Sequence, residues 1–155
     1  MTLHFDETEF ADRKARLMAS MIASNIDAML MFRQESMYWL TGYDTFGYVF
    51  FQSLVMTADG RIVLMTRAPD LRQAQNTSNI ADIRIWVDRD GASPADDLRA
   101  ILDELGLTLA LMPHRTELKD LPPENRFRCL LIDEFQDLST RDLSLLRLIP
   151  TEQTN

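Results

Sequence analysis

Side chains that could bind a metal ion or act as nucleophiles are few in this 155-residue chain. It contains two histidines, His4 near the amino terminus and His114 beside a proline, and a single cysteine, Cys129. Neither histidine has a second ligand at helical or strand spacing, which a zinc site would require. Cys129 lies in an apolar run without an activating neighbour, so we interpret it as a core residue. These residues predict no metal centre and no catalytic nucleophile.

Acidic residues are abundant, and one pair stands where α/β proteins often bind ligands. Asp133 and Glu134 follow an apolar run typical of a strand, and Asp137 and Asp142 come soon after. The carboxyl ends of strands open onto binding crevices in α/β sheets. A metal site, or an autonomous hydrolase or ribonuclease-H-like nuclease built on these acids, is therefore one hypothesis. Nothing in the spacing of the acids fixes their geometry, however.

The charge balance bears on the class of partner. The chain has 24 acidic and 16 basic residues, a formal net charge of −8, and its basic residues are scattered. Nucleic-acid binders normally carry a basic face, so we expect no nucleic-acid partner. No apolar run approaches the roughly 20 residues that cross a bilayer, and the acidic amino terminus is unlike a signal peptide. Together with the single cysteine, this predicts a cytoplasmic protein without a membrane partner.

The most informative segment is rich in aromatic residues. Seven of them lie between positions 38 and 51, namely Tyr38, Trp39, Tyr43, Phe46, Tyr48, Phe50 and Phe51. One interpretation is core packing, which we expect for Trp39 and Phe50. The other is a loop that displays aromatic and polar side chains for recognition, since such residues anchor binding sites. For Tyr43, Asp44, Phe46 and Tyr48 the sequence leaves both interpretations open.

Helical and strand patterns alternate along the chain. Asp6 is a candidate cap for a first helix. The apolar stripe of this helix consists of Phe10, Leu17, Met18, Met21 and Ile22. Arg13 is expected to face away from the stripe. A short helix is predicted over 35–40, with Gly42 at its end. Ser93 and Pro94 are typical of the start of another helix, which Gly106 ends, and a last helix is predicted over 139–149. Strands are predicted over 28–32, 50–56, 61–65, 83–87, 107–112 and 129–132, with an Asp59-Gly60 hairpin turn. We therefore expect one α/β domain over residues 1–155, a mixed β-sheet with helices on both faces.

The chain resembles a known family in several of these segments. They are Glu9, Arg13 and Leu17 in the first helix, the strand over 28–32, the sequence YWLTGY over 38–43, and the strand pair joined by Ala58-Asp59-Gly60. This pattern resembles the N-terminal domain of creatinase and prolidase-type enzymes, a group that includes aminopeptidase P, Xaa-Pro dipeptidase and ectoine hydrolase. The resemblance covers residues 5–107 and is weaker over 108–150.

The resemblance implies a ribonuclease-H-like α/β topology and no chemistry in this chain. In the family, hydrolysis belongs to a following C-terminal pita-bread domain, which holds a dinuclear metal site. We therefore expect no cofactor and no catalytic residue here. The N-terminal domain of such enzymes helps them to dimerise and narrows access to the partner subunit's active site. By position in the pattern, this contact role falls on Tyr43, Asp44, Phe46, Tyr48 and Arg67.

The sequence thus favours the non-catalytic N-terminal domain of a creatinase or Xaa-Pro dipeptidase-type hydrolase. Its expected partners are a second copy of the chain, a C-terminal catalytic domain, or both. The alternative is a stand-alone module that binds a small molecule or a protein and reuses the same fold.

Overall fold

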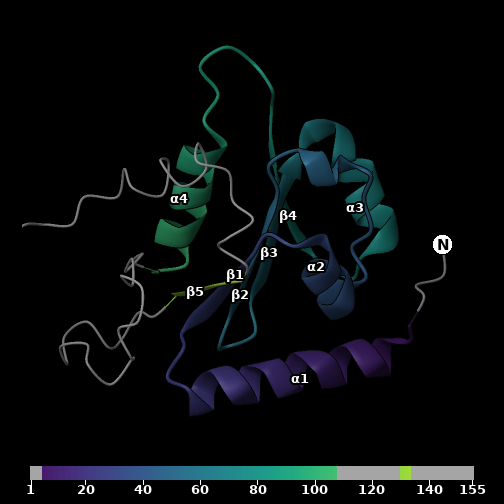
Figure 1. Ribbon diagram of the computed structural model, residues 1–155, viewed down its shortest axis with the longest axis vertical. Coiled ribbons are helices and arrows are strands. Elements are labelled where there is room, and N and C mark those ends of the chain that lie inside the picture. Colours follow the sequence, from purple (N-terminus) through teal and green to yellow (C-terminus); the bar gives the residue numbers. More distant parts are fainter. Residues whose placement is uncertain (1–4, 108–129, 134–155) are drawn as a thin grey trace, which may run out of the picture.

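The computed structural model describes residues 5–107 and 130–133. These residues form four α-helices, two short 3-10 helices and five strands. Figure 1 labels the α-helices and the strands. In chain order they are α1 (Glu7–Ala23), β1 (Ala28–Met31), α2 (Gln34–Thr41), η1 (Gly47–Val49), β2 (Ser53–Thr57), β3 (Ile62–Arg67), η2 (Ala68–Asp70), α3 (Leu71–Thr77), β4 (Asp82–Trp86), α4 (Pro94–Glu104) and β5 (Leu130–Asp133).

The strands form one mixed sheet in the order β4-β3-β2-β1-β5. The central strands β1, β2 and β3 pair antiparallel, whereas β4 and β5 run parallel to β3 and β1 at the two edges. In the β1–β5 pair, Met31 lies opposite Asp133. The predicted mixed sheet is therefore confirmed.

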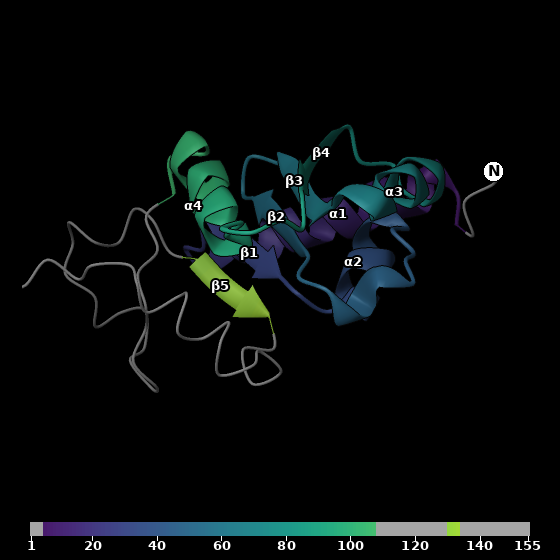
Figure 2. The same ribbon diagram turned by 90° about the horizontal axis from the view of Figure 1, so that it is seen from above.

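Alternation along the strands gives each face of the sheet its own core. Ala28 and Leu30 of β1 point into a cluster with Leu98, Ile101 and Leu102 of α4. Met29 and Met31 point to the opposite face, where α1, α2 and α3 pack. Figures 1 and 2 show α4 separated from these three helices by the sheet. Helices thus cover both faces, as predicted.

The predicted helix ends and turn are also confirmed. The Asp6 carboxylate accepts a hydrogen bond of 2.8 Å from the Glu9 N–H at the start of α1, and Ser93 caps α4 in the same way. Gly42 ends α2 in the left-handed conformation, with φ of 77°. Gly60 has φ of 90° in the β2–β3 turn, which favours glycine because other residues are strained there.

The expected side-chain positions need four corrections. In α1, Arg13 is buried and Ile22 is 61% exposed, the reverse of the expectation. Trp39 and Phe50, expected in the core, are 44% and 41% exposed. Trp39 lies on the side of α2 away from its buried residues, and β2 begins only at Ser53, so Phe50 belongs to the preceding loop.

Some predicted elements lie wholly or partly outside the residues that the structure describes. The strand predicted over 107–112, from position 108 on, and the helix predicted over 139–149 lie outside the described residues. Within the described residues, no helix has the length and apolar character needed to cross a bilayer.

Candidate functional site

The aromatic segment forms a loop between α2 and β2, here called the contact loop (residues 43–50). Tyr43, at its start, is fully buried. Its hydroxyl donates to Oε1 of Gln52 at 2.9 Å and lies 3.0 Å from the Thr66 hydroxyl. Of the two interpretations that the sequence left open for Tyr43, the structure supports core packing, because the ring and hydroxyl complete the core beneath the loop.

Burial also changes the acidity of this phenol. Loss of hydration raises the pKa of Tyr43 above its usual value, and the hydrogen bond with Thr66 opposes this effect in part. Tyr43 consequently stays neutral at physiological pH and serves as a fixed hydrogen-bonding group in the core.

Glutamine side chains tie the two ends of the contact loop together. The amide of Gln34 in α2 donates to the Tyr43 carbonyl at 2.9 Å, and the amide of Gln52 donates to Gln34 Oε1 at 3.3 Å. On the other side, the Thr77 hydroxyl accepts a hydrogen bond of 3.1 Å from the Asp44 N–H. The base of the loop is therefore held by α2, α3 and the sheet.

The tip of the loop is apolar and faces solvent. Phe46 is 86% exposed and Val49 is 71% exposed, and Asp44 is exposed beside them. The side chain of Tyr48 lies outside the described part of the structure. Exposed apolar side chains that are grouped on one loop mark sites of interaction more often than isolated ones do.

Arg67, the last residue of β3, joins the sheet to this loop. Its guanidinium carbon lies 3.5 Å from the centroid of the Phe50 ring, and its Nε lies 3.7 Å from a carboxylate oxygen of Asp70. The Arg67 Nε is buried and has no hydrogen-bond partner among the described residues. The structure therefore brings Arg67 together with Phe50, which the sequence had assigned to the core, whereas Tyr43 lies beneath the loop.

Asp70 and Gly47 are residues of this site that sequence reasoning missed. A Cβ atom at Gly47 would lie only 2.6 Å from a carboxylate oxygen of Asp70. The loop can therefore approach η2 this closely only because residue 47 has no side chain. A glycine in the middle of an aromatic run is the one sequence signal that could have indicated such an approach.

These groups have the chemistry that recognition of another molecule requires. No group of three or more histidine, cysteine or acidic side chains in the described ranges could hold a metal ion. Among the acids considered from sequence, Asp133 ends β5, whereas Glu134, Asp137 and Asp142 lie outside the described residues. What the site offers is an exposed apolar tip, a cation and two carboxylates on a braced loop.

Comparison with known proteins identifies the family. Residues 13–120 match the sequence profile of the "Creatinase/Prolidase N-terminal domain". The chain is also 31% identical over 84 residues to an uncharacterized hydrolase/peptidase of Sinorhizobium fredii. That match covers 54% of this chain and 21% of the relative, so the chain spans about a fifth of the relative's length.

Solved structures share the fold. A proline dipeptidase from Streptococcus pneumoniae superposes with a TM-score of 0.61 at 14% identity, over 88% of this chain and 84% of that one. The N-terminal domain of an X-Pro dipeptidase from Streptococcus pyogenes gives 0.61 at 14% identity, over 93% and 92%. An Xaa-Pro dipeptidase from Bacillus anthracis gives 0.62 at 12% identity, over 92% of this chain but 32% of that protein.

Proposed function

The chain belongs to the creatinase/prolidase N-terminal domain family, and we propose that it is the non-catalytic N-terminal domain of a hydrolase that cleaves Xaa-Pro peptides or related amides. In this proposal the catalytic domain is a separate unit. The contact loop docks against the catalytic half of a partner subunit, helps the enzyme to dimerise and narrows access to the active site there.

The observation that carries this proposal is the exposed apolar tip of a loop whose base is fixed. Phe46 and Val49 expose most of their surface, although the hydrogen bonds of Tyr43 and Gln34 hold the loop below them. A preorganised loop loses little conformational entropy on binding, so apolar residues at its tip contribute more of their burial to affinity. Aromatic residues are also enriched among the residues that dominate interfaces.

Arg67 has the second role in this proposal. Its guanidinium stacks on the Phe50 ring of the contact loop. The nearest carboxylate oxygen of Asp70 lies 3.7 Å from Arg67 Nε and balances the positive charge only in part. We assign it to substrate contact or to the interface, because a guanidinium recognises carboxylates through several donors at once. Asp44 and Tyr48 complete the proposed contact region. A cytoplasmic location is part of the proposal and rests on the single cysteine.

A chimeric enzyme tests the proposal. Residues 5–107 replace the similar region of the Sinorhizobium fredii hydrolase/peptidase, and the chimera is assayed on Xaa-Pro dipeptides by kinetics and sedimentation. Changing Phe46 and Val49 to aspartate should raise KM and reduce the dimer fraction, while kcat per dimer stays the same. Thr57→Ser, a conservative change at the last residue of β2, is the control and should alter neither quantity.

The chain alone provides the complementary test. With manganese, cobalt or zinc added, we expect no hydrolysis of peptides, creatine or nucleic acid. Turnover that disappears on Asp133→Asn or Glu134→Gln would contradict the non-catalytic assignment. A dimer that survives charged substitutions at both Phe46 and Val49 would contradict the contact role of the loop.

A further inference from the structure

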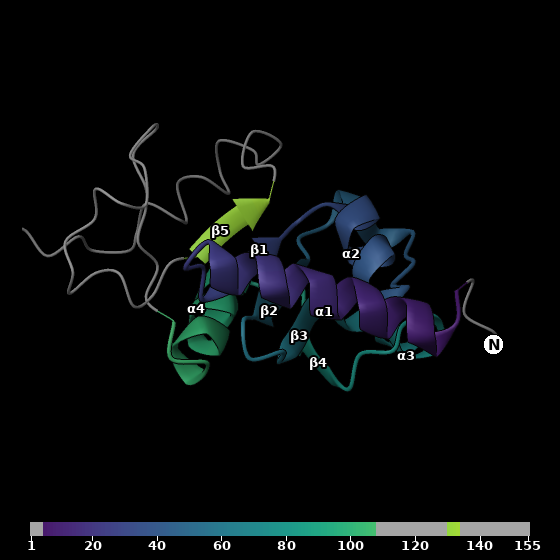
Figure 3. The ribbon, with the colours of Figure 1, turned by 90° about the horizontal axis from the view of Figure 1, so that it is seen from below.

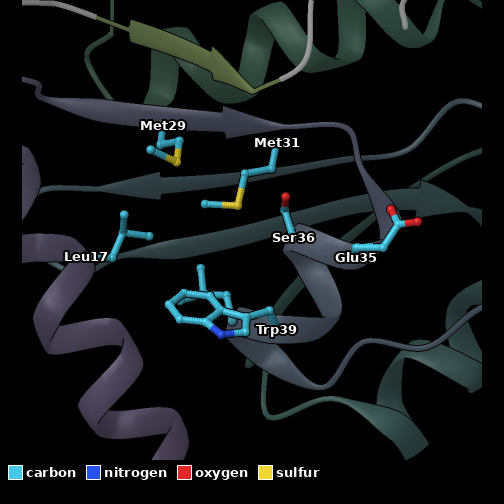
Figure 4. Close-up of a pocket in the computed structure, with 7 residues that line it drawn as sticks. Leu17, Met29, Met31, Glu35, Ser36 and Trp39 are labelled. Atoms are coloured by element: carbon cyan, nitrogen blue, oxygen red, sulfur yellow. The ribbon is translucent and has the colours of Figure 1, made fainter.

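A second apolar surface lies away from the contact loop, in a groove between α1, β1 and α2. The groove has a volume of about 400 Å³. Figure 4 shows Leu17 of α1, Met29 and Met31 of β1 and Trp39 of α2 around it, with Glu35 and Ser36 at one end. The 44% exposure of Trp39, which contradicted its expected core position, belongs to this groove.

The chain leaves the sheet beside this groove. β5 runs parallel to β1, and its last residue, Asp133, lies opposite Met31, which lines the groove. Figures 2 and 3 show β5 at the edge of the sheet, beside β1 and on the same side of the molecule as α2. Whatever follows Asp133 therefore starts at the end of the groove that Glu35 and Ser36 mark.

The sequence that follows has the pattern needed to fill it. The helix predicted over 139–149 carries its apolar stripe on Leu143, Leu146 and Ile149. Five residues, 134–138, separate it from β5, and an extended chain of this length reaches roughly 16–18 Å. That distance allows the predicted helix to turn back over β1 and lie along α1.

We propose that the segment 139–149 docks in this groove as a helix, with Leu143 and Leu146 against Met29, Met31 and Trp39. Unbranched methionine side chains adapt to the shape of a packed partner, so Met29 and Met31 suit a groove that receives a helix. A volume of about 400 Å³ also falls within the roughly 300–1,000 Å³ of small-molecule sites. Such sites have convergent polar groups, whereas the Glu35 side chain here is 77% exposed and points to solvent at the groove's end.

Trp39 fluorescence in the full chain reports on the groove. Trp86→Phe leaves Trp39 as the sole tryptophan and keeps an aromatic ring in the core. In this parent we expect blue-shifted emission and weak quenching by iodide. Changing Leu143 and Leu146 to aspartate should shift the emission to the red and raise the quenching constant at least twofold. Ser144→Asp adds a charge on the opposite side of the predicted helix and should change neither quantity.

Equal quenching in the parent and the double variant would overturn the proposal. Strong quenching of Trp39 in the parent that becomes weak only when an apolar dye is added would also overturn the proposal, since that outcome indicates a ligand site. Because the double aspartate variant could unfold, a disulfide gives an independent test. With Cys129→Ser, cysteines introduced by Leu17→Cys and Leu146→Cys should cross-link within one chain. A cross-link formed only between chains, or none, would contradict docking of the chain's own segment.

Discussion

The guanidinium carbon of Arg67 lies 3.5 Å from the centroid of the Phe50 ring, although 16 positions separate the two residues along the chain. This contact links the end of β3 to the contact loop. Asp70, three residues beyond Arg67, holds the same loop from the side of Gly47. The loop is therefore supported by one short stretch, from Arg67 to Asp70, as well as by the core beneath it.

Gly47→Ala should destabilise the domain. The added Cβ would lie 2.6 Å from an Asp70 carboxylate oxygen and 2.9 Å from the carboxylate carbon, so the half-buried Asp70 side chain, the loop or η2 must shift. Overpacking of this kind typically costs about 1–3 kcal/mol of unfolding free energy. Urea denaturation measures the loss. With Asp70→Ala in the background the clash partner is gone, and the penalty should fall below about 1 kcal/mol. An unchanged penalty in that background would show that Asp70 is not the cause.

Tyr43→Phe should destabilise the domain by about 1–3 kcal/mol near neutral pH, because it leaves buried partners of the hydroxyl unsatisfied. The difference in unfolding free energy between wild type and Tyr43→Phe should become smaller at alkaline pH. Burial raises the pKa of folded Tyr43 above the value of about 10 in the unfolded chain, so the unfolded state loses its proton first. Stability from the neutral phenol is complete below pH 10 and declines as the pH rises toward the folded pKa. Denaturation at pH 8 and pH 11 tests this. A constant difference between wild type and variant would contradict it.

Much of the fold could be predicted because several local signals agree. Asp6 and Ser93 start helices through their own side-chain oxygens, and Gly42 ends one, so these boundaries depend on few neighbours. Strand alternation likewise places Leu30 and Met31 on opposite faces of the sheet, whatever their tertiary neighbours. Such signals come from residue type and spacing alone.

The site was harder to predict because residue type there conflicts with position. In α1, a turn of about 100° per residue places Arg13 on the same face as Phe10 and Leu17, yet its charge suggested exposure. The same rotation places Trp39 about 200° from Met37, opposite the buried face of α2, although its size suggested burial. Spacing was the better guide in both helices. No local pattern indicated that Asp70 would lie against Gly47, because that contact depends on the tertiary path of the loop.

Arg13→Ala should cost far more stability than Arg84→Ala. Arg13 is buried and pairs with Glu9. Its guanidinium donates to the Trp39 carbonyl at 2.7 Å, and the guanidinium carbon lies 4.0 Å from the centroid of the Phe5 ring. Losing charged hydrogen bonds and packing together should remove about 2–4 kcal/mol. Arg84 also pairs with two carboxylates, but its side chain is 42% exposed, and exposed pairs contribute at most about 1 kcal/mol. Thermal melts of both variants make the comparison. Equal losses would contradict the buried role of Arg13.

Phe46→Ala should separate recognition from folding. Phe46 is 86% exposed, so its loss should change the unfolding free energy by no more than about 0.5 kcal/mol. Leu40→Ala, in the helix just before the loop, is the matched control, because Leu40 is 2% exposed and a buried leucine typically contributes about 2–5 kcal/mol. In the chimeric enzyme, Phe46→Ala should nevertheless raise KM or weaken the dimer. If Phe46→Ala melts as early as Leu40→Ala, the side chain packs within the domain. The loop would then not be the contact surface that its exposure indicates.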